Sequence, residues 1–185
     1  MPQQTWQETL STAQGDGSAL TAAAAASCIP AAAKFVLPAN FFSAPGKALL
    51  LKATGRISCA VTTPGTARFD VRFGSTVVAD TLAMSLNVVA KTNVNWWLEF
   101  MLTCRAIGAS GNLMWQGLWI SEAALNTAVP TTGPGPGGFT TPFNAAPAVG
   151  ANFDTTVSQA VDLFFTQTVA TGSLTLHQYW LDAKN

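Results

Sequence analysis

Apolar and polar residues alternate with a period of two along most of the chain from position 18 onward. The pattern is clearest at 68–73, where three apolar residues fall on one face and three charged residues on the other. Because successive side chains of a β-strand point to opposite faces, this segment is predicted to be a strand half-buried on a core. Gly74 and a serine separate it from a second strand at 76–81, so we predict a β-hairpin.

Similar segments recur along the sequence and bring the predicted total to about eight strands. Besides the hairpin, they span 19–29, 46–59, 95–107, 113–121, 152–169 and 173–184. Short strands joined by turns predict an all-β fold, a two-sheet antiparallel β-sandwich of jelly-roll type. Alanine is the strongest helix former, so the tract Ala22–Ala26 leaves a short helix open as an alternative to the first strand.

Two neighbouring strands carry most of the tryptophans. In 95–107, Trp96 lies on the face that we expect to meet the core, whereas Trp97 lies on the opposite face. The partner segment 113–121 has apolar residues on both faces, which predicts a strand covered on two sides.

The 185 residues have the length of one domain. We expect residues 18–185 to form a single sandwich and residues 1–17 to form an N-terminal arm. Within the sandwich, 129–150 is rich in Gly and Pro, which disfavour regular strands and helices, so we predict a long ordered loop. Apolar side chains in the arm and the loop would let both lie on a neighbouring surface. The candidate docking or interface residues are Trp6, Phe139, Phe143 and Val149.

The chain holds only nine Lys plus Arg and nine Asp plus Glu residues, and its formal net charge is zero. Soluble proteins usually carry charges on about a quarter of their residues, so we expect much of this exterior to be buried against neighbours. Zero net charge gives no attraction to nucleic acid, and no apolar run is long enough to span a membrane. The N-terminus also lacks the pattern of a secretion signal. We therefore predict neither nucleic acid nor a membrane as a partner.

Residues that could carry chemistry are few. The single histidine, His177, could form a triad with Asp154 or Asp162, but no nucleophile-elbow motif accompanies it. Asp16 lies in a glycine-rich turn without the further carboxylates that calcium needs, and the Gly/Pro run at 133–138 lacks the lysine of a phosphate-binding loop. The three cysteines lack CxxC spacing, which indicates buried free thiols. We therefore predict that the protein is not an enzyme and that it binds neither a metal ion nor a cofactor.

Six tryptophans also suggest a carbohydrate-binding module, in which exposed indoles stack on sugar rings. Five of them fall inside predicted strands: Trp96, Trp97, Trp115, Trp119 and Trp180. Because large aromatic side chains dominate cores and protein interfaces, we favour core or interface positions for these five and a free position for Trp6 alone.

The order of the segments adds a further indication. An Ala/Thr-rich opening strand precedes LLKATGRIS at 50–58, FDVRFG at 69–74, CRAIG at 104–108 and GSLTLHQYWL at 172–181. This succession, over residues 18–184, resembles small β-sandwich virion proteins of tailed bacteriophages. The resemblance implies a structural role without catalysis, commonly as a homotrimer.

From these observations we expect a non-enzymatic capsid decoration or minor capsid protein. It would be made in the host cytoplasm and displayed on the virion surface, with copies of itself and the major capsid protein as partners. A tail-associated or fibre-associated structural protein and a carbohydrate-binding module for host attachment are the alternatives.

Overall fold

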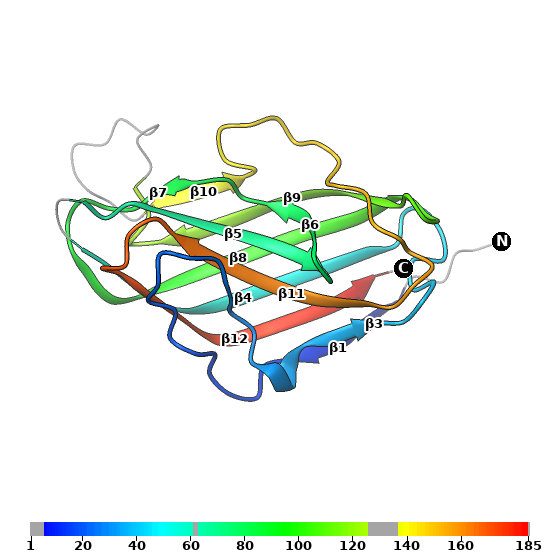
Figure 1. Cartoon of the computed structure of the whole chain (residues 1–185), viewed down its shortest axis with the longest axis horizontal. Coiled ribbons are helices and arrows are strands. Elements are labelled where there is room, and N and C mark those ends of the chain that lie inside the picture. The colour runs from blue at the N-terminus through cyan, green and yellow to red at the C-terminus, as the bar shows by residue number, and fades with distance from the viewer. Residues whose placement is uncertain (1–5, 61–62, 126–136, 185) are drawn as a thin grey trace.

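The computed structural model describes residues 6–60, 63–125 and 137–184. Two antiparallel sheets lie face to face, with their strands running along the long axis of the molecule (Figure 1). Sheet A contains, in spatial order, β1 (Gln7–Thr12), β12 (Ser173–Lys184), β4 (Ala48–Cys59), β8 (Lys91–Ala106), β9 (Asn112–Ser121) and β10 (Gly137–Thr141). Sheet B contains β2 (Ala26–Ser27), β11 (Gln159–Gln167), β5 (Thr66–Phe73) and β6 (Thr76–Asp80).

Two further short strands extend sheet B: β3 (Phe35–Leu37) pairs with β11, and β7 (Met84–Ser85) pairs with β5. One 3₁₀ turn, Ala31–Ala33, is the only helical element in the described part of the chain, and no helix there could cross a membrane. The predicted all-β, two-sheet antiparallel sandwich is confirmed, whereas its jelly-roll connectivity stays a prediction. The described residues form twelve strands rather than about eight, because short strands extend both sheets.

The predicted hairpin is present as β5 and β6, with Phe73 opposite Thr76. Gly74 in the turn has φ of 59°, a left-handed conformation that glycine adopts without steric cost. The inward side chains of β5 meet sheet A in the core. Phe69 there contacts Trp96 of β8 and Trp119 of β9, with ring centroids 5.5 and 5.7 Å away. The alternation in the sequence therefore follows burial between the two sheets.

The core face of β8 is the one predicted from Trp96. Its inward side chains, Trp96, Leu98, Phe100, Leu102 and Cys104, are fully buried. The prediction that β9 is covered on two sides is wrong within this chain, because Leu118 and Ile120 on its second face are exposed.

The predicted first strand at 19–29 is also mostly wrong. Only Ala26–Ser27 is a strand there, although Leu20 forms an isolated bridge with Leu174. The helix considered for Ala22–Ala26 does not form either. This tract is largely exposed, since its small side chains offer little apolar surface to bury.

The N-terminal segment is not wholly an arm outside the sandwich. Gln7–Thr12 forms β1, which pairs with β12 at one edge of sheet A. Residues 1–5 of the expected arm lie outside the described residues. The backbone hydrogen bonds that β12 offers along its free side account for this added strand.

The prediction of a loop without strands at 129–150 is wrong at the centre of this segment. Residues 129–136 lie outside the described residues, but Gly137–Thr141 forms β10 along β9. Glycine weakens a strand without forbidding it, and Phe139 offsets that cost by stacking on Trp119 at a centroid distance of 5.7 Å. After β10 the chain returns as a loop that is fixed by hydrogen bonds from the Phe143 and Gly150 backbone N–H groups.

Candidate functional site

The outer face of sheet A, which points away from sheet B, holds the polar and aromatic side chains that could meet a ligand. The register places Trp180 of β12 opposite Lys52 of β4, and Lys52 opposite Glu99 of β8. Glu99 in turn lies opposite Leu118 of β9. Neighbouring strands are about 4.8 Å apart, so the face measures about 19 Å from β12 across to β10.

Three shallow hollows cross this face. The first is lined by Lys52, Trp97, Trp180 and Asp182 and has a volume of about 270 Å³. The second, of about 300 Å³, is lined by Glu99, Met101, Gln116, Gly117 and Leu118. The third, also of about 300 Å³, lies between β9 and the loop after β10. Gln116 and Gly117 line both the second and the third, and a Lys52–Glu99 ion pair links the first to the second. We call this row of three hollows the sheet A trough.

Two indoles form one end of the trough. Trp97 of β8 and Trp180 of β12 reach toward each other across β4, with ring centroids 6.4 Å apart and ring planes at 37°. Both side chains are half-buried, in contrast to Trp96 and Trp119, which are fully buried in the core. An indole that packs sideways against its neighbour and keeps a face open is a platform for a flat apolar ligand surface.

A carboxylate is held in place beside this platform. Asp182 accepts a hydrogen bond from the Thr9 hydroxyl at 2.7 Å and another from the Gln7 side-chain amide at 3.1 Å. Both donors come from β1, so the added edge strand orients Asp182. Lys52 and Glu99 face each other more loosely, with 3.8 Å between Nζ and Oε2 and both side chains partly exposed. Such a surface pair is weak and can exchange its partners for a ligand.

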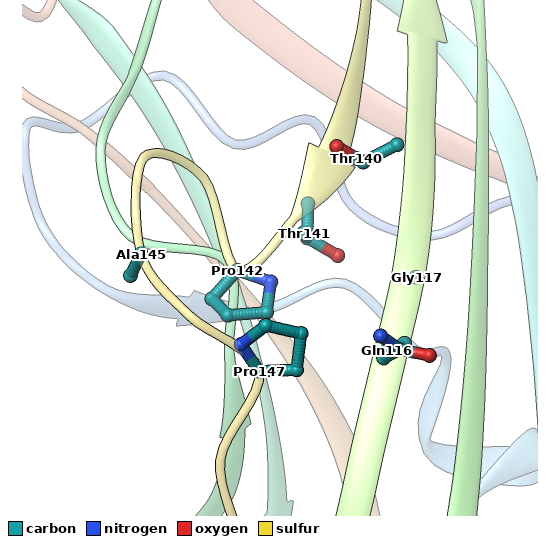
Figure 2. A pocket seen from close by; sticks show the side chains of 7 residues that line it. All are labelled: Gln116, Gly117, Thr140, Thr141, Pro142, Ala145 and Pro147. Carbon is teal, nitrogen blue, oxygen red and sulfur yellow. The ribbon is translucent and has the colours of Figure 1, made fainter.

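The far end of the trough is shown in Figure 2, where Thr140, Thr141 and Pro142 face Gln116 across the hollow. Gly117 also lines this hollow, and a Cβ atom at this position would lie 2.5 Å from the Glu99 carbonyl oxygen and 2.8 Å from the Thr141 hydroxyl. The Thr141 hydroxyl is buried and has no hydrogen-bond partner among the described residues. Thr140 and Gln116 are exposed and present a hydroxyl and an amide to the hollow.

The four candidate docking residues do not form one cluster. Trp6 is 43% exposed and Val149 is 50% exposed. Phe139 is only 2% exposed and contacts Phe143, which is half-buried against the core, at a centroid distance of 4.7 Å. Phe139 is therefore a core residue of sheet A, and its expected place on an open loop is wrong because β10 turns it inward.

The tryptophan pair was not found from the sequence as a site. The period-two alternation did place Trp97 on the face away from Trp96. For Trp180 the same rule gives the outer face, because its neighbour Tyr179 is buried. What the pattern lacks is the order of strands in the sheet, which brings β8 and β12 to either side of β4.

The titratable groups away from the trough are dispersed. His177 lies 2.7 Å from Asp16, not beside Asp154 or Asp162 as a triad would require. Asp154 is bound by the Thr156 hydroxyl and backbone N–H, which lower the pKa of its carboxyl. No three metal-binding side chains come together within residues 6–60, 63–125 and 137–184.

The three cysteines are buried and free, as expected. Burial raises the pKa of the Cys28 thiol, and the negative charges of Asp162 and Asp70 raise it further. Burial also raises the pKa values of Cys59 and Cys104. Because thiolates rather than thiols react, none of these cysteines is suited to be a nucleophile.

The fold and the site thus define a two-sheet β-sandwich with an open, aromatic outer face. No protein-family model matches the chain, and no curated protein matches it. Among solved structures it is similar to the CBM2 module of the evolved Dit of Lactobacillus casei BL23 phage J-1, with 9% sequence identity and a TM-score of 0.28. The alignment covers 82% of this chain and 68% of that one. A TM-score of 0.28 does not establish a common fold, and no functional conclusion follows from it.

Proposed function

We propose that the chain is a non-enzymatic structural protein of a bacteriophage virion, displayed on the particle surface as a capsid decoration or minor capsid protein. It assembles as a homotrimer and docks onto the major capsid protein. A tail or fibre position would use the same docking surface and is the alternative. The scarcity of charge and the dispersal of the titratable groups support a role in assembly rather than in catalysis.

The observation that carries this proposal is a set of exposed apolar side chains at one end of the sandwich, where β8 ends and β9 begins (right in Figure 1). Trp6, Ile107, Val149 and Val157 are each between 43% and 50% exposed. We call this set the apolar end. It includes two of the residues that the sequence singled out for docking.

Hydrogen bonds and cation–π contacts connect the loops that carry the residues of the apolar end. The Gly108 backbone N–H, next to Ile107, donates to the Thr155 hydroxyl at 2.8 Å, and Thr155 is two residues before Val157. The Thr155 carbonyl accepts from the Asn40 N–H, and the following Phe41 ring lies 4.0 Å from the Lys47 ammonium.

Lys47 also connects Trp6 to this end. Its ammonium lies 5.8 Å from the centre of the Trp6 ring, which partly shields the charge from water. Val149 adjoins the start of β9 through its bridge to Met114. Hydrogen bonds and cation–π contacts hold the loops of this surface in place. Apolar side chains on such an ordered surface lose little conformational entropy on docking, which favours a stable contact with a larger assembly.

The proposal is tested by binding the purified chain to empty shells and, separately, to isolated tails of the phage that encodes it. Wild-type chain is expected to bind shells, and the variants Val157→Asp and Trp6→Asp to bind at least about tenfold more weakly, because a charge is then buried in the contact. Val88→Asp is the matched control, since Val88 is 53% exposed at the opposite end of β8.

Three outcomes decide between the alternatives. Binding to shells supports a decoration or minor capsid protein, and binding to tails alone supports the tail alternative. Binding to neither, or equal loss in the Val88→Asp control, contradicts docking through the apolar end. Light scattering of the free chain measures the proposed trimer separately.

A further inference from the structure

We infer that the sheet A trough is a binding site for a neutral glycan, whose pyranose rings stack on Trp97 and Trp180 while the chain continues across β4, β8 and β9. This site does not depend on the proposed docking at the apolar end. None of the four residues of the apolar end lines the trough, so the two surfaces can be tested by different variants.

The indole pair supplies the stacking surface. The two rings meet at 37° with centroids 6.4 Å apart, which is too close for a ligand to slip between them but leaves a common open surface. One face of a pyranose ring consists of C–H groups with partial positive charge, and the face of an indole is negative. A shallow, partly apolar surface of this kind suits a sugar ring better than an extended peptide, because β12, β4 and β8, the strands that form it, are each paired on both sides within sheet A.

Polar groups beside the platform suit sugar hydroxyls. Asp182 already has one hydrogen bond to each carboxylate oxygen, from Thr9 and Gln7, and each oxygen can accept a further one. Lys52 on the opposite side can donate to a hydroxyl or a ring oxygen. The site therefore contains an oriented acceptor and a donor around an apolar platform, which is the usual composition of a small-molecule site.

The charges of the trough favour a neutral ligand. Two carboxylates, Asp182 and Glu99, flank the single ammonium of Lys52, so an anionic ligand would face net repulsion. A quaternary ammonium group, which aromatic residues also bind, would meet the Lys52 ammonium in the same hollow. A sugar without charge avoids both costs.

The length of the trough favours an oligosaccharide over a single sugar. Beyond the indoles, the hollow of Met101, Gln116 and Leu118 continues the apolar floor. It then opens into the hollow of Figure 2, where Gln116 and Thr140 present polar groups. A glycan that spans several strands would reach both ends, so affinity should rise with chain length.

The test uses the full chain, cellohexaose and chitohexaose as neutral probes, and a printed array of neutral oligosaccharides to extend the search. Binding is measured by calorimetry and by the change in tryptophan fluorescence. We expect at least one of these glycans to bind, and Trp97→Ala and Trp180→Ala each to weaken that binding about three- to tenfold. Trp180→Phe should recover part of the loss, because a phenyl ring can still stack.

Matched variants separate binding from folding. Trp6→Ala removes an exposed indole outside the trough and should leave glycan affinity unchanged. Asp182→Asn keeps the shape of the side chain but replaces one acceptor oxygen by a donor that faces Thr9 or Gln7, so it should lower the glycan affinity and the unfolding midpoint together. Gln116→Ala should weaken the binding of hexasaccharides more than that of disaccharides.

Three results would overturn the inference. One is the absence of binding to every neutral glycan on the array at millimolar concentration. The other is binding that survives unchanged in folded Trp97→Ala and Trp180→Ala variants. Selective binding of acidic glycans would also contradict it, since the charges of the trough oppose them.

Discussion

The rings of Trp97 and Trp180 have centroids 6.4 Å apart, although β4 separates the strands β8 and β12 that carry them. In the register of the sheet, Trp180 lies opposite Lys52 of β4 and Trp97 lies opposite Thr54, so the two indoles meet over β4. The contact between the two indoles therefore depends on the correct pairing of β8, β4 and β12. Because it lies on the outer face of sheet A, it involves no side chain of the core between the sheets.

Phe139 should behave as a core residue rather than as a docking residue. Phe139→Ala removes a ring that stacks on Trp119 at 5.7 Å, so we expect a loss of about 3–5 kcal/mol in the free energy of unfolding. Urea denaturation measures it. The control Val149→Ala, at an exposed position, should change the value by less than about 0.5 kcal/mol. Equal effects of the two substitutions would show that Phe139 is not part of the core.

Gly117 should tolerate no side chain. A Cβ atom there would come within 2.5 Å of the Glu99 carbonyl oxygen, so Gly117→Ala should cost about 1–3 kcal/mol of stability. In Gly138→Ala the nearest atom would be 3.5 Å away, an ordinary contact, and this variant serves as the control. If thermal unfolding midpoints of the two variants coincide, β9 and β10 do not pack as described.

The pKa of the Asp154 carboxyl should lie below its ordinary value of 3.8. The Thr156 hydroxyl and backbone N–H bind its charged form, so the folded pKa lies below the unfolded one. The resulting stability is present above the unfolded pKa and is lost as the pH falls through the folded pKa. NMR titration of the carboxyl carbons measures this, and Thr156→Val should raise the pKa part of the way back. A titration unaffected by that substitution would count against the contact.

The cysteines should react slowly with a thiol reagent in the native protein. Cys28, Cys59 and Cys104 are at most 4% exposed, and burial raises the pKa of each thiol. At mildly alkaline pH we expect little release of colour from Ellman's reagent until guanidinium chloride is added, after which all three react. Rapid reaction of any of them before unfolding would indicate an opening of the sandwich near that residue.

The sequence was sufficient to predict those parts of the fold in which burial follows a period of two. The strand at 68–73 and the inward face of Trp96 are examples, because the apolar side chains at every second position are buried in the core, although Asp70 on the outer face of 68–73 is buried as well. β10 was missed since its glycines give no alternation, and its stability comes from pairing with β9 and from the Phe139–Trp119 stack. β1 was missed because its side chains are mostly exposed and carry little hydrophobic signal.

The site was harder to predict than the fold. Trp97, Lys52 and Trp180 could each be placed on the outward face of their own strands, but no local pattern reveals that β12 lies beside β4 or that β1 supplies the donors to Asp182. These contacts join residues far apart in the chain, and they follow from the order of strands in sheet A.

That order has a consequence for biosynthesis. β12 occupies an interior position in sheet A, between β1 and β4, yet it follows the other eleven described strands in the sequence, so it is synthesised after all of them. Until β12 is inserted, one edge of β4 is unpaired and Trp97 lacks its contact with Trp180. A nascent polypeptide, or one that has lost β12 by proteolysis, would therefore expose unpaired backbone N–H and C=O groups that the folded protein covers. Such a chain should aggregate unless chaperones bind it or synthesis is completed rapidly.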